Sequence, residues 1–278
     1  MNIVNILEEI EKVDGEIYER LSPRRKAMKE FYNFGSKVAL ASIPLALGSM
    51  FKKAYGQSAA PVVLSVLNFA LTLEYLEYHF YNHSLLAAPG LIPSGPATGA
   101  ITTIRDHEKA HVDLLAGAIT AAGGTPVSFT YDQFDFTAKG TFNTVYSNYS
   151  TFLAVAQAFE DTGVRAYKGQ ASALMGSPYL EVALNIHSVE ARHASHIRQM
   201  RKAPAGGGVN IKPWITGAND SGVAAVDAVF AGEDNVVQAG ITITNINGQT
   251  VPLSAATESF DEPLTRPQVE AIASLFIK

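Results

Sequence analysis

Residues 108–111 read Glu-Lys-Ala-His, and residues 190–193 read Glu-Ala-Arg-His. Both motifs lie in stretches that we predict to be helical, where residues three apart share one face. A carboxylate and an imidazole at that spacing can hold one metal ion together, or can bridge two ions. One such pair would mean little, whereas two on separate helices indicate a common metal site. The ligands predicted from these motifs are Glu108, His111, Glu190 and His193.

Two further stretches each carry a glutamate that is followed seven residues later by a tyrosine. Glu74 precedes Tyr81, and Glu160 precedes Tyr167. Seven residues make about two helical turns, so each tyrosine shares a face with its glutamate. Both glutamates lie in apolar stripes, where a carboxylate is costly unless it is paired or bound to metal. We predict that Glu74 and Glu160 complete the ligand set, and that the tyrosine hydroxyls can hydrogen-bond to ligand carboxylates.

Glu77 is the alternative to Glu74, because it has an apolar stripe of its own in the same stretch. Both glutamates could point toward the axis of a helical bundle. The Glu-to-Tyr offset that ends at Tyr81 also occurs in the stretch of Glu160, and this favours Glu74 as the ligand. Glu77 is then expected to lie beside the site and to interact with the ligands.

Four helices are predicted between residues 57 and 202. A Gly/Pro-rich loop separates the first two, a long connection separates the second from the third, and a short turn precedes the fourth. One long crossover between two helix pairs is the connectivity of ferritin-like bundles. The pattern of ligands also fits, since these bundles take one Glu from each of two helices and Glu-x-x-His from each of the others. The predicted helices are about Pro61–Leu86, Ala100–Ala122, Thr151–Met175 and Tyr179–Arg201.

Composition limits the chemistry. The chain has 278 residues, of which 47% are hydrophobic, so it can bury a substantial core. A net charge of −5 gives no reason to expect nucleic acid as a partner. There is no cysteine, so a transition metal must be held by His, Asp and Glu. Four carboxylates and two neutral imidazoles balance two divalent ions, which we predict to be iron or manganese, with zinc as an ion that could be found after purification.

Residues 1–56 form a separate N-terminal segment. The pair Arg24-Arg25, the apolar run Val38–Phe51 and Ala54-Tyr55-Gly56 resemble a twin-arginine export signal. The apolar run is too short for a transmembrane helix. We therefore predict an exported, periplasmic protein, which sequencing the N-terminus of the mature chain would test. The alternative is a cytoplasmic protein whose N-terminal helices pack onto the bundle or onto a partner.

Residues 203–278 form a C-terminal appendage that is richer in Gly, Asn and β-branched residues. The segment Ala239–Pro252 predicts one β-hairpin that turns at Asn247-Gly248. A closing helix is predicted for Thr265–Ile277, with Thr265 and Gln268 at the spacing of a capping box. The appendage could cover one end of the bundle or mediate assembly. A homo-oligomer is therefore one of the possible states of the protein.

The chain resembles bacterial ferritin-like domain proteins, a group that also includes plant desiccation-related proteins. The resemblance spans about residues 60–278. It implies the bundle and the metal site more firmly than any reaction. It is carried by LNFALTLEYLEYHFY (67–81), HEKAH (107–111), FEDTGVRAY (159–167), VEARHASHIR (189–198), GEDNVVQAG (232–240) and ESFDEPLTRPQVEAIA (258–273).

In several ferritin-like families an aspartate precedes the Glu of the Glu-x-x-His motif and holds the opposite histidine. Here those two positions are His107 and Val189, so the hydrogen bonds around the ligands must differ. Asp106 and Asp161 are the predicted substitutes. His107 itself is expected on the helix surface or next to a ligand, and not as a ligand.

The metal centre itself would carry the chemistry, with dioxygen or peroxide as its partner. One hypothesis is oxidation of Fe(II), a ferroxidase-type activity in iron handling or protection from oxidants. A second is peroxide disproportionation by a dimanganese centre, as in the manganese catalases. A third is a structural or stress-protective protein whose metals only stabilise the bundle. Fold analogy does not choose between them, and no separate catalytic side chain is predicted.

Overall fold

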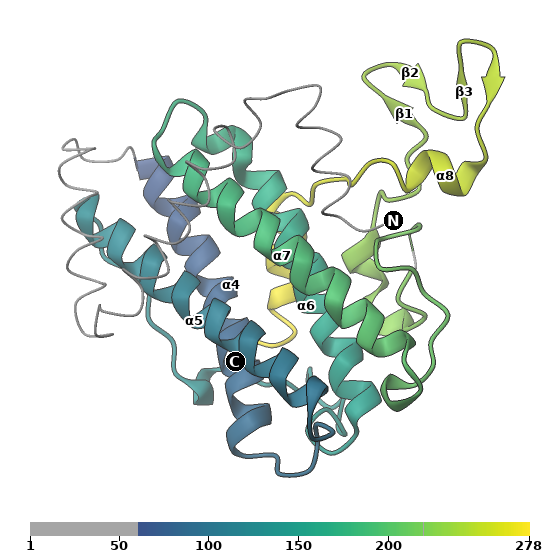
Figure 1. Cartoon of the computed structure of the whole chain (residues 1–278). Coiled ribbons are helices and arrows are strands. Elements are labelled where there is room, and N and C mark those ends of the chain that lie inside the picture. The colour runs from purple at the N-terminus through teal and green to yellow at the C-terminus, as the bar shows by residue number, and fades with distance from the viewer. Residues whose placement is uncertain (1–60, 219) are drawn as a thin grey trace, which may run out of the picture. The chain divides into compact units, whose positions relative to one another are not determined.

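The computed structural model describes residues 61–218 and 220–278. Four long helices run side by side in this part of the chain (Figure 1). α4 packs mainly against α5, and α6 against α7. The predicted bundle with one long crossover is confirmed. The helices are α4 (Pro61–Leu86), α5 (Pro96–Ala121), α6 (Tyr149–Gln170) and α7 (Tyr179–Lys202).

The predicted export signal lies in residues 1–56 and therefore outside the described residues, so export stays a prediction. Among the helices that are described, none is both long enough and apolar enough to cross a membrane.

The helix boundaries differ from the prediction at two places. α5 begins at Pro96, four residues before the predicted start. Its first turn therefore lies within the Gly/Pro-rich segment that was predicted to be a loop. Proline is tolerated there because the first helical residue needs no N–H donor, and Gly95 before it adopts a φ of 94°. α6 ends at Gln170, and its predicted last turn is instead the 3₁₀ helix η2 (Ala171–Leu174).

Two apolar clusters fill the bundle, and a polar layer separates them. One cluster holds Phe80 of α4 and Ile197 of α7, and the other holds Leu71 of α4 and Ile186 of α7. Glu74 and Glu190 lie between these positions along their helices. The layer is therefore closed above and below by packed side chains, so any charge within it is removed from water.

The C-terminal end of the chain packs onto the bundle and onto the crossover. α9 (Arg266–Ala273) begins with the predicted capping box of Thr265 and Gln268. It buries Val269 and Ile272, and Phe276 follows it into the same core. The crossover, which includes the 3₁₀ helix η1 (Tyr131–Gln133), is tied to this end, since the amide of Asp135 donates to the carbonyl of Phe276 at 2.8 Å.

Arg165 and Gly169 of α6 fix the path of the appendage. The buried Arg165 guanidinium donates to the carbonyl of Glu262 at 2.8 Å and pairs with Glu233 at 2.9 Å. At Gly169 a Cβ atom would lie 1.9 Å from the carbonyl oxygen of Leu264, so only glycine lets the chain cross the helix this closely. The segment before α9 is thereby held against α6.

Two short hairpins replace the single predicted one. The predicted turn at Asn247-Gly248 is present, with φ values of 54° and 76°. An additional turn lies at Ala239-Gly240, with φ values of 50° and 82°, and alanine is not a residue that signals such a turn. The strands are β1 (Val237–Gln238), β2 (Ile241–Thr242), β3 (Asn245–Ile246) and β4 (Gln249–Thr250). The short helices η3 (Pro204–Gly206), η4 (Ala224–Phe230) and α8 (Leu253–Thr257) complete the appendage.

Candidate metal centre

The structure brings all six predicted ligands together in the polar layer. The four glutamates are 0% exposed, and the two histidines are less than one-tenth exposed. α4 and α6 each supply one glutamate, whereas α5 and α7 each supply a glutamate and a histidine three residues later. The six residues are Glu74, Glu108, His111, Glu160, Glu190 and His193.

These residues form two overlapping groups, each able to offer four donor atoms to an ion. Within each group the donor atoms lie within 4.8 Å of one another. Glu108 and Glu190 belong to both groups, so each can bridge two ions. The first group is Glu74, Glu108, His111 and Glu190, and the second is Glu108, Glu160, Glu190 and His193.

The two oxygens of each bridging glutamate point to different histidines. Glu108 places Oε2 at 3.2 Å from Nδ1 of His111 and Oε1 at 2.8 Å from Nδ1 of His193. Glu190 places Oε1 at 3.1 Å and Oε2 at 3.6 Å from the same two nitrogens. Glu74 lies 3.1 Å from His111 only, and Glu160 lies 3.4 Å from His193 only.

Tyr81 and Tyr167 hydrogen-bond to the glutamates that lie in only one group. The hydroxyl of Tyr81 on α4 donates to Glu160 on α6 at 2.5 Å, and Tyr167 on α6 donates to Glu74 on α4. Burial raises the pKa of both tyrosines well above the usual value, so both keep the proton that they donate. Each carboxylate is thus held by the helix opposite its own.

Glu77 is also buried, at 3% exposure, but it belongs to neither group. Its carboxylate lies where Gly163 of α6 leaves room, since a Cβ there would be 3.3 Å from Oε1 of Glu77 and 3.6 Å from Oε2 of Glu190. Burial, then the charges of Glu190 and Glu108, raise the pKa of Glu77 well above its usual range. This shift favours a neutral Glu77 beside the ligand carboxylates.

The residues fit a metal centre because several of their inward atoms face only one another and lack a well-formed hydrogen bond. Eight buried side-chain atoms of the described residues lack a hydrogen bond, and five of them belong to this cluster. Buried polar atoms are normally satisfied, so such a concentration indicates a ligand. The five are Glu108 Oε1, Glu160 Oε2, both carboxylate oxygens of Glu190, and His193 Nδ1.

The electrostatics of the cluster also call for cations. Burial raises the pKa of Glu108 well above its usual range and that of Glu160 to about 7. Burial alone would lower the pKa values of the two histidines, but Glu74 raises that of His111 and Glu160 raises that of His193. Protonated imidazoles therefore offset part of the carboxylate charge in the metal-free protein, and bound metal ions would take their place.

The prediction that Asp106 and Asp161 hold the ligand histidines is wrong. Asp106 is exposed and pairs with Arg105 at 2.6 Å, whereas Asp161 is buried against Arg198 at 2.6 Å. Each aspartate is paired with an arginine on its own or a neighbouring helix, and among the described residues neither contacts a ligand histidine.

His107 takes the role that was predicted for an aspartate. Its Nδ1 lies 2.9 Å from Nε2 of His193, and the two rings stack with centroids 5.2 Å apart. Burial and the neighbouring His193 lower the pKa of His107, which favours a neutral ring that can accept a hydrogen bond. In the neutral form of His193 that a metal ion would bind, Nε2 can donate to His107 while Nδ1 keeps a lone pair that faces Glu108 and Glu160.

We expect His107→Ala to weaken metal binding at the His193 side by about 10–100-fold, because an unsupported imidazole loses its preferred tautomer and orientation. Binding at the His111 side should change much less. Calorimetric titration of the metal-free protein with Mn(II) would give the binding affinities of the two sides separately. Lys109→Ala on the same helix is the control, since Lys109 is exposed and, within the described residues, pairs with Asp113 alone. Equal weakening of both sides would contradict this role for His107.

The cluster opens on one side only among the described residues. A cavity of about 460 Å³ lies over the histidines and is lined by His107, His111, Arg192 and His193, among others. On the opposite side Ile272 of α9 closes the space between α4 and α6, where a gap of about 10 Å³ remains beside Glu77. Such a gap holds about one water at most, whereas the larger cavity opens onto the histidines between α5 and α7.

A bundle with paired carboxylates on two helices and Glu-x-x-His on the other two defines the class of ferritin-like carboxylate proteins. The chain belongs to the ferritin-like domain family, whose model matches residues 63–203, from α4 to just past the end of α7. Comparison with curated proteins and with solved structures returned no match.

Proposed function

We propose that the chain holds two iron or manganese ions through Glu74, Glu108, His111, Glu160, Glu190 and His193, and that this centre consumes dioxygen or peroxide. Oxidation of Fe(II) is the reaction that we favour, in iron handling or in protection from oxidants. The observation that carries the proposal is the pair of bridging glutamates, each with one oxygen toward either histidine. When bound, two adjacent redox-active ions supply the electrons and the Lewis acidity for such chemistry.

The open side of the cluster supports a reactive centre over a purely structural one. Structural metal sites are closed by protein ligands, whereas catalytic sites keep a position for a reactant. Here each group offers four protein donor atoms, fewer than the six that iron and manganese commonly take. The cavity over His111 and His193 leads to this position. The protein's own contribution is to fix the carboxylates through Tyr81 and Tyr167 and to exclude water from the layer.

Metal content is the first test. We expect elemental analysis to find close to two Fe or Mn per chain. Aerobic addition of Fe(II) to metal-free protein should give a rise in ferric absorbance, which Glu108→Ala should abolish. Asp113→Ala is the matched control on the same helix, because Asp113 is exposed and outside both groups.

Three other results would assign a different role to the site or exclude it. Rapid loss of peroxide from the manganese-loaded form, without Fe(II) oxidation, would assign a catalase-type reaction to the same site. Zinc alone, or two ions without either reaction, would favour a structural or stress-protective role. Absence of any metal would contradict the site itself.

A further inference from the structure

A second cavity, of about 680 Å³, runs between α5 and α7 and ends at the metal centre. α5 and α7 contact each other only sparsely, because each packs against its own partner helix. His193 and Arg192 line both this cavity and the one over the histidines. The volume lies in the range of small-molecule sites.

We infer that this cavity binds a small carboxylic acid with an apolar tail, whose carboxylate lies at Arg192 and whose tail extends toward Pro93. The inference goes beyond the proposed function, because the cavity is formed by the protein alone and does not require bound metal.

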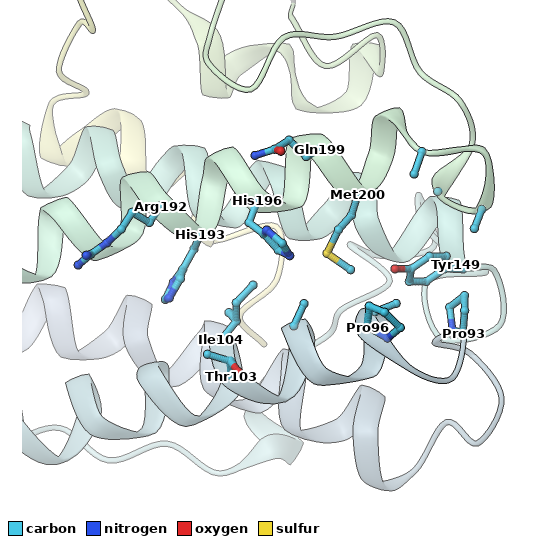
Figure 2. A pocket seen from close by; sticks show the side chains of 15 residues that line it. Pro93, Pro96, Thr103, Ile104, Tyr149, Arg192, His193, His196, Gln199 and Met200 are labelled. Carbon is cyan, nitrogen blue, oxygen red and sulfur yellow. The ribbon is translucent and has the colours of Figure 1, made fainter. Parts of the chain in front are cut away.

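The lining supports an apolar tail. Figure 2 shows His196 and Met200 directed from α7 toward α5, with Ile104 and Pro96 on the facing helix. Small residues such as Ala100 widen the space between the helices. From Arg192 to Lys202, where α7 ends, the helix extends for about 15 Å, a length that suits an extended chain. Most of the lining can therefore be desolvated by hydrocarbon at little cost.

The charges support an acidic head. Among the described residues, Arg192 is the only Lys or Arg in the lining, and no Asp or Glu lines the cavity. Within the described part of the chain, no carboxylate pairs with Arg192 and no hydrogen bond holds its guanidinium. A guanidinium at one end of an apolar cavity is complementary to a carboxylate, which it can bind through two parallel hydrogen bonds. The head of such a ligand would lie next to His193, and its tail would point away from the metals.

The test is calorimetric titration of the full chain with decanoate, with decanol as the neutral probe of the same tail. We expect sub-millimolar binding of decanoate and binding of decanol that is at least about ten-fold weaker. Arg192→Gln should remove this difference. Ala100→Phe should weaken decanoate at least about ten-fold by filling the cavity. Ala191→Phe is the matched control, because it adds the same side chain at an exposed position outside both cavities.

Each other outcome would overturn the inference. Failure of decanoate to bind, or equal binding by wild type and Ala100→Phe, would exclude the cavity as its site. Equal binding of decanol and decanoate would exclude Arg192 as the partner of an acidic head. A change of oligomeric state in Ala100→Phe, without decanoate binding, would assign the cavity to a second copy of the chain. Metal content measured on the same samples separates these outcomes from a failure of the metal proposal.

Discussion

Replacing Glu190 by alanine is expected to abolish binding of both metal ions, whereas replacing Glu74 should remove only one. Glu190 directs one oxygen toward His111 and the other toward His193, so its loss opens both groups at once. Of the two ligand histidines, Glu74 contacts His111 and not His193. Because even residues that support a ligand change metal affinity by about 10–100-fold, loss of a bridging ligand should exceed that range. Elemental analysis after dialysis would give close to zero, one and two ions for Glu190→Ala, Glu74→Ala and wild type.

Two further variants serve as controls for this experiment. Glu181→Ala removes an exposed glutamate from the same helix as Glu190 and should retain both ions. Glu160→Ala should mirror Glu74→Ala, because of the two ligand histidines Glu160 contacts His193 and not His111. Retention of two ions by Glu190→Ala, or equal losses in Glu190→Ala and Glu74→Ala, would contradict the bridging arrangement.

The convergence of the six side chains could be predicted because the signal is local. Glu and His three residues apart must share a helix face wherever the helix packs. The choice of Glu74 over Glu77 rested on the tyrosine offset that both helices share. The structure shows why that offset occurs in both helices: Tyr81 reaches across to Glu160, and Tyr167 reaches back to Glu74. The repeat therefore reflects a reciprocal contact between α4 and α6.

The hydrogen bonds around the ligands could not be predicted, because they depend on how closely two helices approach. His107 and His193 are 86 residues apart, and their contact exists only because α5 and α7 face each other across the site. Asp161 has the charge of a suitable partner, but it lies on the side of α6 that faces Arg198. Spacing along one helix gives the face of a residue, but it does not give the neighbour across the bundle.

The appendage shows the same division between local and long-range information. The start of α9 was evident from Thr265 and Gln268, which form the capping box within four residues. Its position over the site depends on Gly169 and Arg165, which are about a hundred residues earlier. Only the structure reveals that α9 closes the face between α4 and α6. The cavity of about 460 Å³ lies instead on the histidine side of the cluster.

Replacing Arg198 by methionine is expected to lower the free energy of unfolding by about 3–5 kcal/mol. Arg198 is 1% exposed and donates two hydrogen bonds to Asp161, at 3.1 and 2.6 Å. It also pairs with Asp220 and donates to the carbonyl of Trp214 at 3.1 Å, so it joins α6 and α7 to the appendage. Without it two buried carboxylates lose their counter-charge. Urea unfolding of the metal-free protein would measure the loss without a contribution from bound metal.

The size of this effect comes from the carboxylates left behind more than from the arginine itself. Removing one partner of a buried pair leaves an uncompensated charge, whereas removing both is often nearly neutral. Asp161→Leu combined with Arg198→Met should therefore recover part of the lost stability, with Asp220 accounting for the remainder. Arg192→Met is the control on the same helix, because Arg192 is exposed and unpaired within the described residues, and its change should stay within about 0.5 kcal/mol. An Arg198→Met protein that unfolds at the urea concentration of the wild type would show that the pair does not secure the appendage to the bundle.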